Sequence, residues 1–81
     1  MMPKKKLTES IQQCSAREAL AFNMVRLRAE HRWSQEDLAY EAQVHRTFVT
    51  QVERQQRNIT LDNLEKLAKA LGVTPSALLA E

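Results

Sequence analysis

The 81-residue chain contains little glycine, proline or cysteine, and each shortage narrows the class of protein. One glycine and two prolines are too few for a sheet with many tight turns, so helices joined by short loops fit the composition better. Cys14 is the only cysteine, which excludes an intramolecular disulfide and favours a reducing compartment. No apolar run approaches the roughly 20 residues of a membrane span. Because the basic start, residues 1–7, also lacks the apolar segment of a signal peptide, we expect a soluble, cytoplasmic protein.

The chain also lacks the residue groups that catalysis and cofactor binding require. His31 and His45 are its only histidines, and Cys14 lies in the N-terminal segment, so neither a metal site nor a Cys–His pair is indicated. A single glycine excludes a glycine-rich loop around a phosphate. We therefore expect no enzyme activity, no metal, no cofactor and no small-molecule ligand.

What the chain does contain is a series of helix signals within one small domain. Ser15 and Glu18 form a capping-box pattern, which opens a helix predicted to run from residue 16 to residue 30 or 31. The N-caps Ser34 and Thr60 mark the starts of later helices, and Pro75 marks another start as a first helical residue. Gly72 marks the C-terminal end of a helix. Two apolar stripes at helical spacing are Leu20, Met24 and Leu27, and then Leu61, Leu64, Leu67 and Leu71. These signals predict an all-α fold of five helices over residues 16–81.

Residues 34–54 have the pattern of a short helix, a tight turn and a second short helix. Leu38, Ala39 and Ala42 repeat at helical spacing, and Val49 and Val52 mark the inward side of the second helix. The second helix also carries side chains that the core does not need: Arg46, Thr47, Phe48, Thr50, Gln51 and Arg54. A helix-turn-helix places such a helix in the major groove of DNA, where arginine and glutamine bind base edges. An ordinary solvated helix face is the alternative.

The positive charge of the chain is concentrated beside this second helix. Between residues 45 and 58 there are three arginines and one glutamate, whereas residues 59–81 hold two lysines against three carboxylates. An asymmetry of this kind suits contact with phosphates on one side of a domain.

These residues also resemble a known family. Residues 34–39 and 44–54 are similar to the helix-turn-helix of the lambda repressor and Cro type, the Xre family, and residues 64–73 match the family's fourth helix. Residues 45–48, with Arg54 and residues 57–60, resemble the controller proteins of restriction-modification systems. The resemblance implies a compact five-helix lambda-repressor-like domain, and a sequence-specific transcriptional regulator that binds double-stranded DNA as a homodimer on a two-fold operator. Alternatives are an antitoxin, a phage-type repressor, or a helical protein-interaction module without DNA binding.

The resemblance further implies roles for individual residues. Base contacts fall to Arg46, Thr47, Thr50 and Gln51, with Phe48 either touching a thymine methyl group or lying flat on the domain. Phosphate contacts fall to Gln35, Arg54, Arg57 and Asn58. Arg28 and Glu53 occupy positions that form a buried ion pair in the family. Family members often carry glycine at three positions that are Arg32, Gln43 and Gln55 here, so a left-handed conformation there would cost roughly 1 kcal/mol each.

Two surfaces need a partner. Ile59, Ala77 and Leu79 leave apolar area that one small domain would not bury, so we expect them to form the dimer interface. Phe22, with Val25, is the competing surface on the first helix, which we expect the segment around residue 11 to cover. Residues 1–15 themselves are either a basic N-terminal arm that reaches DNA phosphates or a short extra helix.

Overall fold

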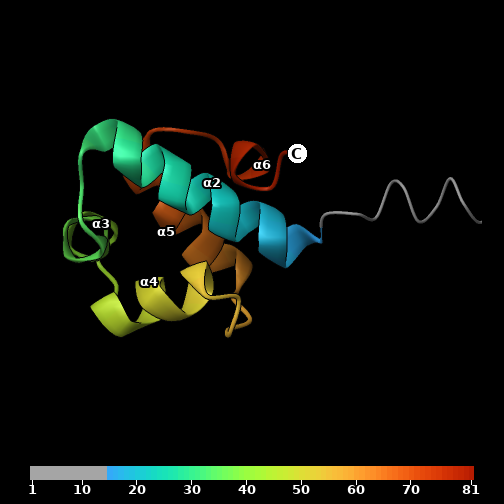
Figure 1. The fold of residues 1–81 in the computed structure, drawn as a ribbon, viewed down its shortest axis with the longest axis horizontal. Coiled ribbons are helices and arrows are strands. Elements are labelled where there is room, and N and C mark those ends of the chain that lie inside the picture. The colour runs from blue at the N-terminus through green and yellow to red at the C-terminus, as the bar shows by residue number, and fades with distance from the viewer. Residues whose placement is uncertain (1–14) are drawn as a thin grey trace, which may run out of the picture.

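The computed structural model describes residues 15–81, and within them five helices and no strand occur (Figure 1). The helices are α2 (Ala16–His31), α3 (Gln35–Ala42), α4 (Arg46–Glu53), α5 (Leu61–Leu71) and α6 (Pro75–Leu78). This confirms the predicted all-α class and the end of the first helix at His31. The expectations for an N-terminal arm, and for a segment around residue 11 that covers the first helix, lie outside the described residues.

The helix ends follow from the residues beside them. Ser15 and Ser34 each complete a capping box, with Glu18 and Asp37 respectively, and Thr60 accepts a hydrogen bond from the Asn63 amide. Each of these side chains satisfies a backbone N–H group that the first helical turn leaves unpaired. Pro75 begins α6, as the sequence predicts, because a proline at the first helical position loses no hydrogen bond.

Three non-glycine residues hold the left-handed conformation at helix ends. Arg32, Gln43 and Gln55 all have φ of 61°, and Gly72 has φ of 75°. Each position closes its helix with backbone hydrogen bonds, as between the amide of Val44 and the carbonyl of Ala39. The chain therefore has the helix ends of the resembled family and carries the steric cost of a Cβ atom at three of them.

The core lies where the five helices meet. Met24, Leu38, Leu67, Leu78 and Val49 are fully buried there, one or more from every helix. Trp33 packs against this core just before α3, as expected for a residue that precedes an N-cap. One expectation was wrong. Leu61 was expected on the buried stripe of α5, but it is 79% exposed because it is the first residue of the helix and none of residues 15–81 buries it.

Asn23 fastens the C-terminal segment to α2. Its buried side-chain amide nitrogen donates to the carbonyl oxygens of Leu78 at 2.9 Å and Ala80 at 2.8 Å. Because α6 has only four residues, too few to form a stable helix alone, this amide and the buried Leu78 side chain fix its position.

Candidate nucleic-acid interface

Helix α4 lies along one edge of the domain, with α3 across one end of it and α6 on the far side near α2 (Figure 1). Its inward side is apolar, since Val49 and Val52 are at most 1% exposed, as predicted. Arg46 and Thr47 are exposed, and Thr50 and Gln51 are half-buried. The structure thus places all four predicted base-contacting polar residues on one helix whose other side is fixed in the core.

The prediction that Phe48 contacts a base is wrong. It is only 7% exposed and belongs to the core with Val49 and Val52. A thymine methyl group has no access to a ring in this position, because the domain itself covers the ring. What remains of its outer side lies under the guanidinium group of Arg57, whose central carbon is 5.1 Å from the ring centroid.

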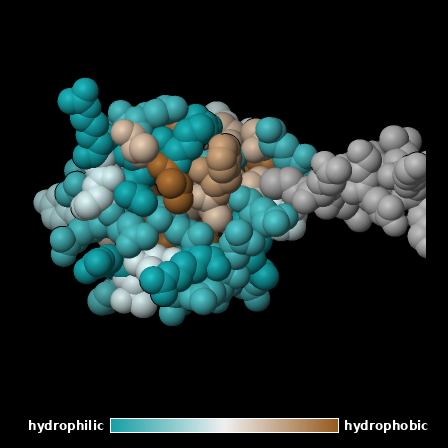
Figure 2. Space-filling view, viewed as in Figure 1, coloured by the Kyte–Doolittle hydropathy of each residue, from teal (hydrophilic) through white to brown (hydrophobic). Residues whose placement is uncertain are grey.

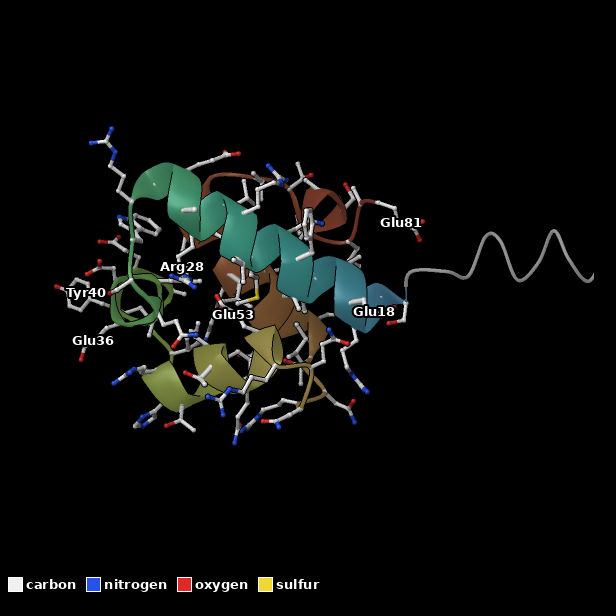
Figure 3. All side chains as sticks on the ribbon, viewed as in Figure 1. Glu18, Arg28, Glu36, Tyr40, Glu53 and Glu81 are labelled. Atoms are coloured by element: carbon white, nitrogen blue, oxygen red, sulfur yellow. The ribbon has the colours of Figure 1, made fainter. Side chains whose placement is uncertain are left out.

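The Arg28 and Glu53 side chains pair as the resemblance implies. Arg28 Nε is 2.8 Å from Glu53 Oε2, and Nη2 is 3.0 Å from Oε1, a two-point contact between α2 and the end of α4. Figure 3 shows the two side chains facing each other in the space between these helices. Arg28 also donates to the Trp33 carbonyl at 3.0 Å, so one guanidinium group joins α2, the loop before α3, and α4. With side-chain exposures of 18% and 6%, the pair is largely shielded from water.

Gln35 extends this network to the exposed side of α4. Its amide nitrogen donates to Glu53 Oε1 at 2.8 Å, and its amide oxygen accepts from the Thr50 hydroxyl at 3.0 Å. The first residue of α3 is thereby tied to α4 through two side chains. A contact between the Gln35 side chain and a phosphate stays a prediction, and it would use the second N–H group of the amide, because the first donates to Glu53.

The N-terminus of α4 differs from those of α2, α3 and α5. Each of those helices has an acidic residue in its first turn, whereas α4 has none. His45, at the N-cap, makes no side-chain capping hydrogen bond. The partial positive charge of this helix end and the exposed Arg46 are therefore not neutralised from within α4. Glu36 of α3 lines the same open pocket as His45 and Arg46. Such an end attracts anions, and a DNA phosphate is one.

The loop after α4 carries further cationic groups. Arg57 Nη1 donates to Gln51 Oε1 at 2.8 Å, and Arg54 is exposed at the C-cap of α4. Asn58 accepts a hydrogen bond from Arg17, which lies at the start of α2. No local sequence pattern indicates Arg17, because the contact joins residues 41 positions apart. Arg17 thus adds a fourth cation beside the three predicted from residues 45–58.

The predicted dimer residues are only partly brought together. Ile59 and Leu79 line an open groove of about 390 Å³ with Leu20, Leu61 and Leu64, between the start of α2 and the start of α5. Leu79 is 38% exposed. Ala77, on α6, is half-buried and does not line the groove.

Neither a metal site nor a membrane-spanning helix is found in the described part of the chain. Residues 15–81 contain no group of three histidine, cysteine or acidic side chains placed to hold a metal ion. None of the helices between these residues is both long enough and apolar enough to cross a membrane.

Comparison with known proteins gives consistent matches. A family model described as helix-turn-helix matches residues 25–78. Control protein C.BamHI of Bacillus amyloliquefaciens is 56% identical over 46 residues, which are 57% of this chain and 57% of that protein. A hypothetical transcription factor of Neisseria meningitidis is 49% identical over 63 residues, 78% of this chain and 59% of that protein. The chain thus spans less than two thirds of the length of these two curated relatives.

A solved structure has the same arrangement of helices. The restriction-modification controller protein C.AhdI of Aeromonas hydrophila superposes with a TM-score of 0.71 and 40% sequence identity. The match covers 74% of this chain and 91% of that one. The similarity therefore extends over the helix-turn-helix and the helices that support it.

Proposed function

Because the chain belongs to the helix-turn-helix family of the lambda repressor and Cro type, we propose that it is a sequence-specific, DNA-binding transcriptional regulator. In this proposal α4 enters the major groove and Arg46, Thr47, Thr50 and Gln51 contact base edges. Gln35, Arg54, Arg57 and Asn58 contact phosphates and set the position of α4 on the duplex. No catalytic role is assigned to any residue, and a cytoplasmic location is part of the proposal.

The proposal rests on how the domain holds α4 and on which side of this helix is exposed. Its buried side is held by Val49 and Val52, and its end is held by the Arg28–Glu53 pair. Its other side exposes arginine and threonine at an N-terminus whose first turn holds no acidic residue. A rigid helix with an exposed polar side and an electropositive end has the features that reading a major groove requires.

The proposal includes a homodimer. One helix reads only a few base pairs, too few to select a site in a genome, whereas two copies about 34 Å apart read a two-fold operator. The apolar groove at Ile59 and Leu79 supports this, because a symmetric contact through it would bury Leu61 and Leu79, which are 79% and 38% exposed. Ala77, the third predicted interface residue, does not line this groove.

A restriction-modification controller is the narrower form of the proposal. Two of the compared proteins carry that description, C.BamHI as a control protein and C.AhdI as a controller protein. A controller of this kind would bind the DNA upstream of its own gene. A methyltransferase or endonuclease gene beside the gene for this chain would support this form, and a toxin gene in that place would favour an antitoxin.

A binding titration tests the proposal. Fluorescence anisotropy with the DNA upstream of the protein's own gene, and with a scrambled duplex of equal length, is measured at 50 mM and 200 mM salt. We expect tight binding to the upstream DNA and a steep loss of affinity with salt, because bound cations release counterions from the phosphates. Equal affinity for both duplexes, or no binding at the lower salt concentration, would contradict the proposal.

A further inference from the structure

Gln51 and Arg57 form a hydrogen-bonded pair beside the exposed side of α4. Gln51 Oε1 accepts from Arg57 Nη1 at 2.8 Å. A guanidinium group has donors and no acceptor, so the Gln51 amide must turn its oxygen, and not its nitrogen, toward Arg57. The amide nitrogen, which only donates, is then the group that is left to meet a ligand in front of α4.

Arg57 is held on a second side by an aromatic ring. Its guanidinium carbon lies 5.1 Å from the centroid of Phe48, within the range of a cation–π contact. Phe48 is a core residue, so its ring, on which the guanidinium group lies, is fixed relative to α4. Arg57 itself lies in the loop after the helix, and its contacts with Gln51 and Phe48 place its guanidinium group beside the helix.

On the basis of the proposed function, we infer that Arg57 is a positioning residue that makes Gln51 a hydrogen-bond donor toward DNA and thereby selects guanine over adenine. A glutamine with a free amide favours adenine, because its oxygen accepts from N6 while its nitrogen donates to N7. Here the oxygen already takes part in a charge-assisted bond, which is stronger than a neutral one. Adenine N6 could approach only the second lone pair of that oxygen, in competition with the guanidinium group of Arg57 beside it.

Guanine fits the pair without this competition. In the major groove it presents the acceptors O6 and N7, and either of them matches the donor nitrogen of Gln51. Thymine offers only one acceptor, O4, and cytosine offers a donor, its N4 amino group. The expected order at the base pair facing Gln51 is therefore guanine first and cytosine last.

The experiment first finds the operator by selection from randomised duplexes with the full chain. Gln51→Ala is then titrated against every single-base variant of the selected site, and the position at which it loses discrimination is the one that Gln51 faces. At this position we expect the unmodified protein to bind guanine at least about fivefold more tightly than adenine, the lower end of what one good base contact gives.

Arg57→Ala tests the role of the arginine directly. It frees the Gln51 amide to bind adenine through N6 and N7, so the preferred base should change from guanine to adenine. Loss of a phosphate contact alone would weaken all four duplexes alike and keep their order. Gln51→Glu keeps a partner for Arg57 but removes the outward donor, so the guanine preference should disappear. Lys66→Ala, an equal loss of charge on the exposed side of α5, should leave the order of bases unchanged.

The outcomes separate this inference from the function on which it rests. If no duplex is selected, both are wrong. If an operator is selected but adenine is preferred opposite Gln51, or Arg57→Ala leaves the base order unchanged, the inference fails while DNA binding stands. The same holds if Gln51→Ala changes discrimination at no position.

Discussion

Glu53 joins three elements of the interface through its carboxylate, because α2, α3 and α4 meet there. Its carboxylate accepts two hydrogen bonds from Arg28 and one from Gln35, and its side chain is only 6% exposed. Glu53→Gln would leave the Arg28 guanidinium without its counter-charge in a largely dry position, so we expect unfolding to become easier by about 3 kcal/mol. Chemical denaturation monitored by circular dichroism measures this change.

A matched control is available on α2. Arg26 and Glu30 form an ion pair at 3.0 Å, but their side chains are 46% and 59% exposed. Water screens such a pair, so Glu30→Gln should cost about 0.5 kcal/mol or less. Equal effects of the two substitutions would show that the Arg28–Glu53 pair does not hold α4 in place.

Two exposed arginines have different predicted roles, a base contact for Arg46 and a phosphate contact for Arg54, and affinity measurements can distinguish them. Arg46→Ala should relax base preference at one position, with a loss of about 1–3 kcal/mol on the operator and little change on random DNA. Arg54→Ala should weaken binding to all sequences alike and reduce the salt slope by about 1. Anisotropy titrations on operator and scrambled duplexes at several salt concentrations test both. An Arg46→Ala variant with full preference for the operator would remove Arg46 from the base-contacting set.

At the scale of helices, the turn between α3 and α4 stores strain at Gln43. Its φ of 61° brings Cβ into steric conflict with its own backbone, while its side chain gains only a 3.3 Å hydrogen bond to the Tyr40 carbonyl. Gln43→Gly removes the conflict, so we expect a gain of about 0.5–1 kcal/mol in stability. Gln43→Ala keeps the Cβ atom and should give no gain. A lower melting temperature for the glycine variant would show that the hydrogen bond outweighs the strain.

The helices also show which features could be predicted from the sequence and which could not. Helix ends depend on neighbouring residues, as with Ser34 and Asp37, so they could be placed in advance. The side of a helix that becomes buried depends on elements packed from elsewhere in the chain, which is why Phe48 and Leu61 were misplaced. Contacts between distant segments, such as that of Arg17 with Asn58, leave no local pattern. The Arg28–Glu53 pair was anticipated only through the family resemblance, since spacing alone would not have joined residues 25 positions apart.

At the scale of the whole molecule, two apolar surfaces compete for a partner. One is the groove lined by Ile59, Leu61 and Leu79. The other lies on α2, where Phe22 and Val25 are 67% and 44% exposed. Figure 2 shows apolar side chains running along α2 across an otherwise hydrophilic face. A globular protein does not usually leave both surfaces in water, so at least one of them is expected to bind another molecule.

The groove is the better candidate for the dimer because its apolar residues come from three segments and form a concave surface, whereas Phe22 and Val25 stand on a single helix. Leu79→Asp places a charge at this groove without disturbing the buried Leu78, so it should give a folded monomer with weak operator binding. Phe22→Asp should remain dimeric. Sedimentation velocity with both variants, checked for folding by circular dichroism, distinguishes the surfaces. A dimeric Leu79→Asp beside a monomeric Phe22→Asp would place the two-fold contact on α2, and with it a different spacing of the two α4 helices on DNA.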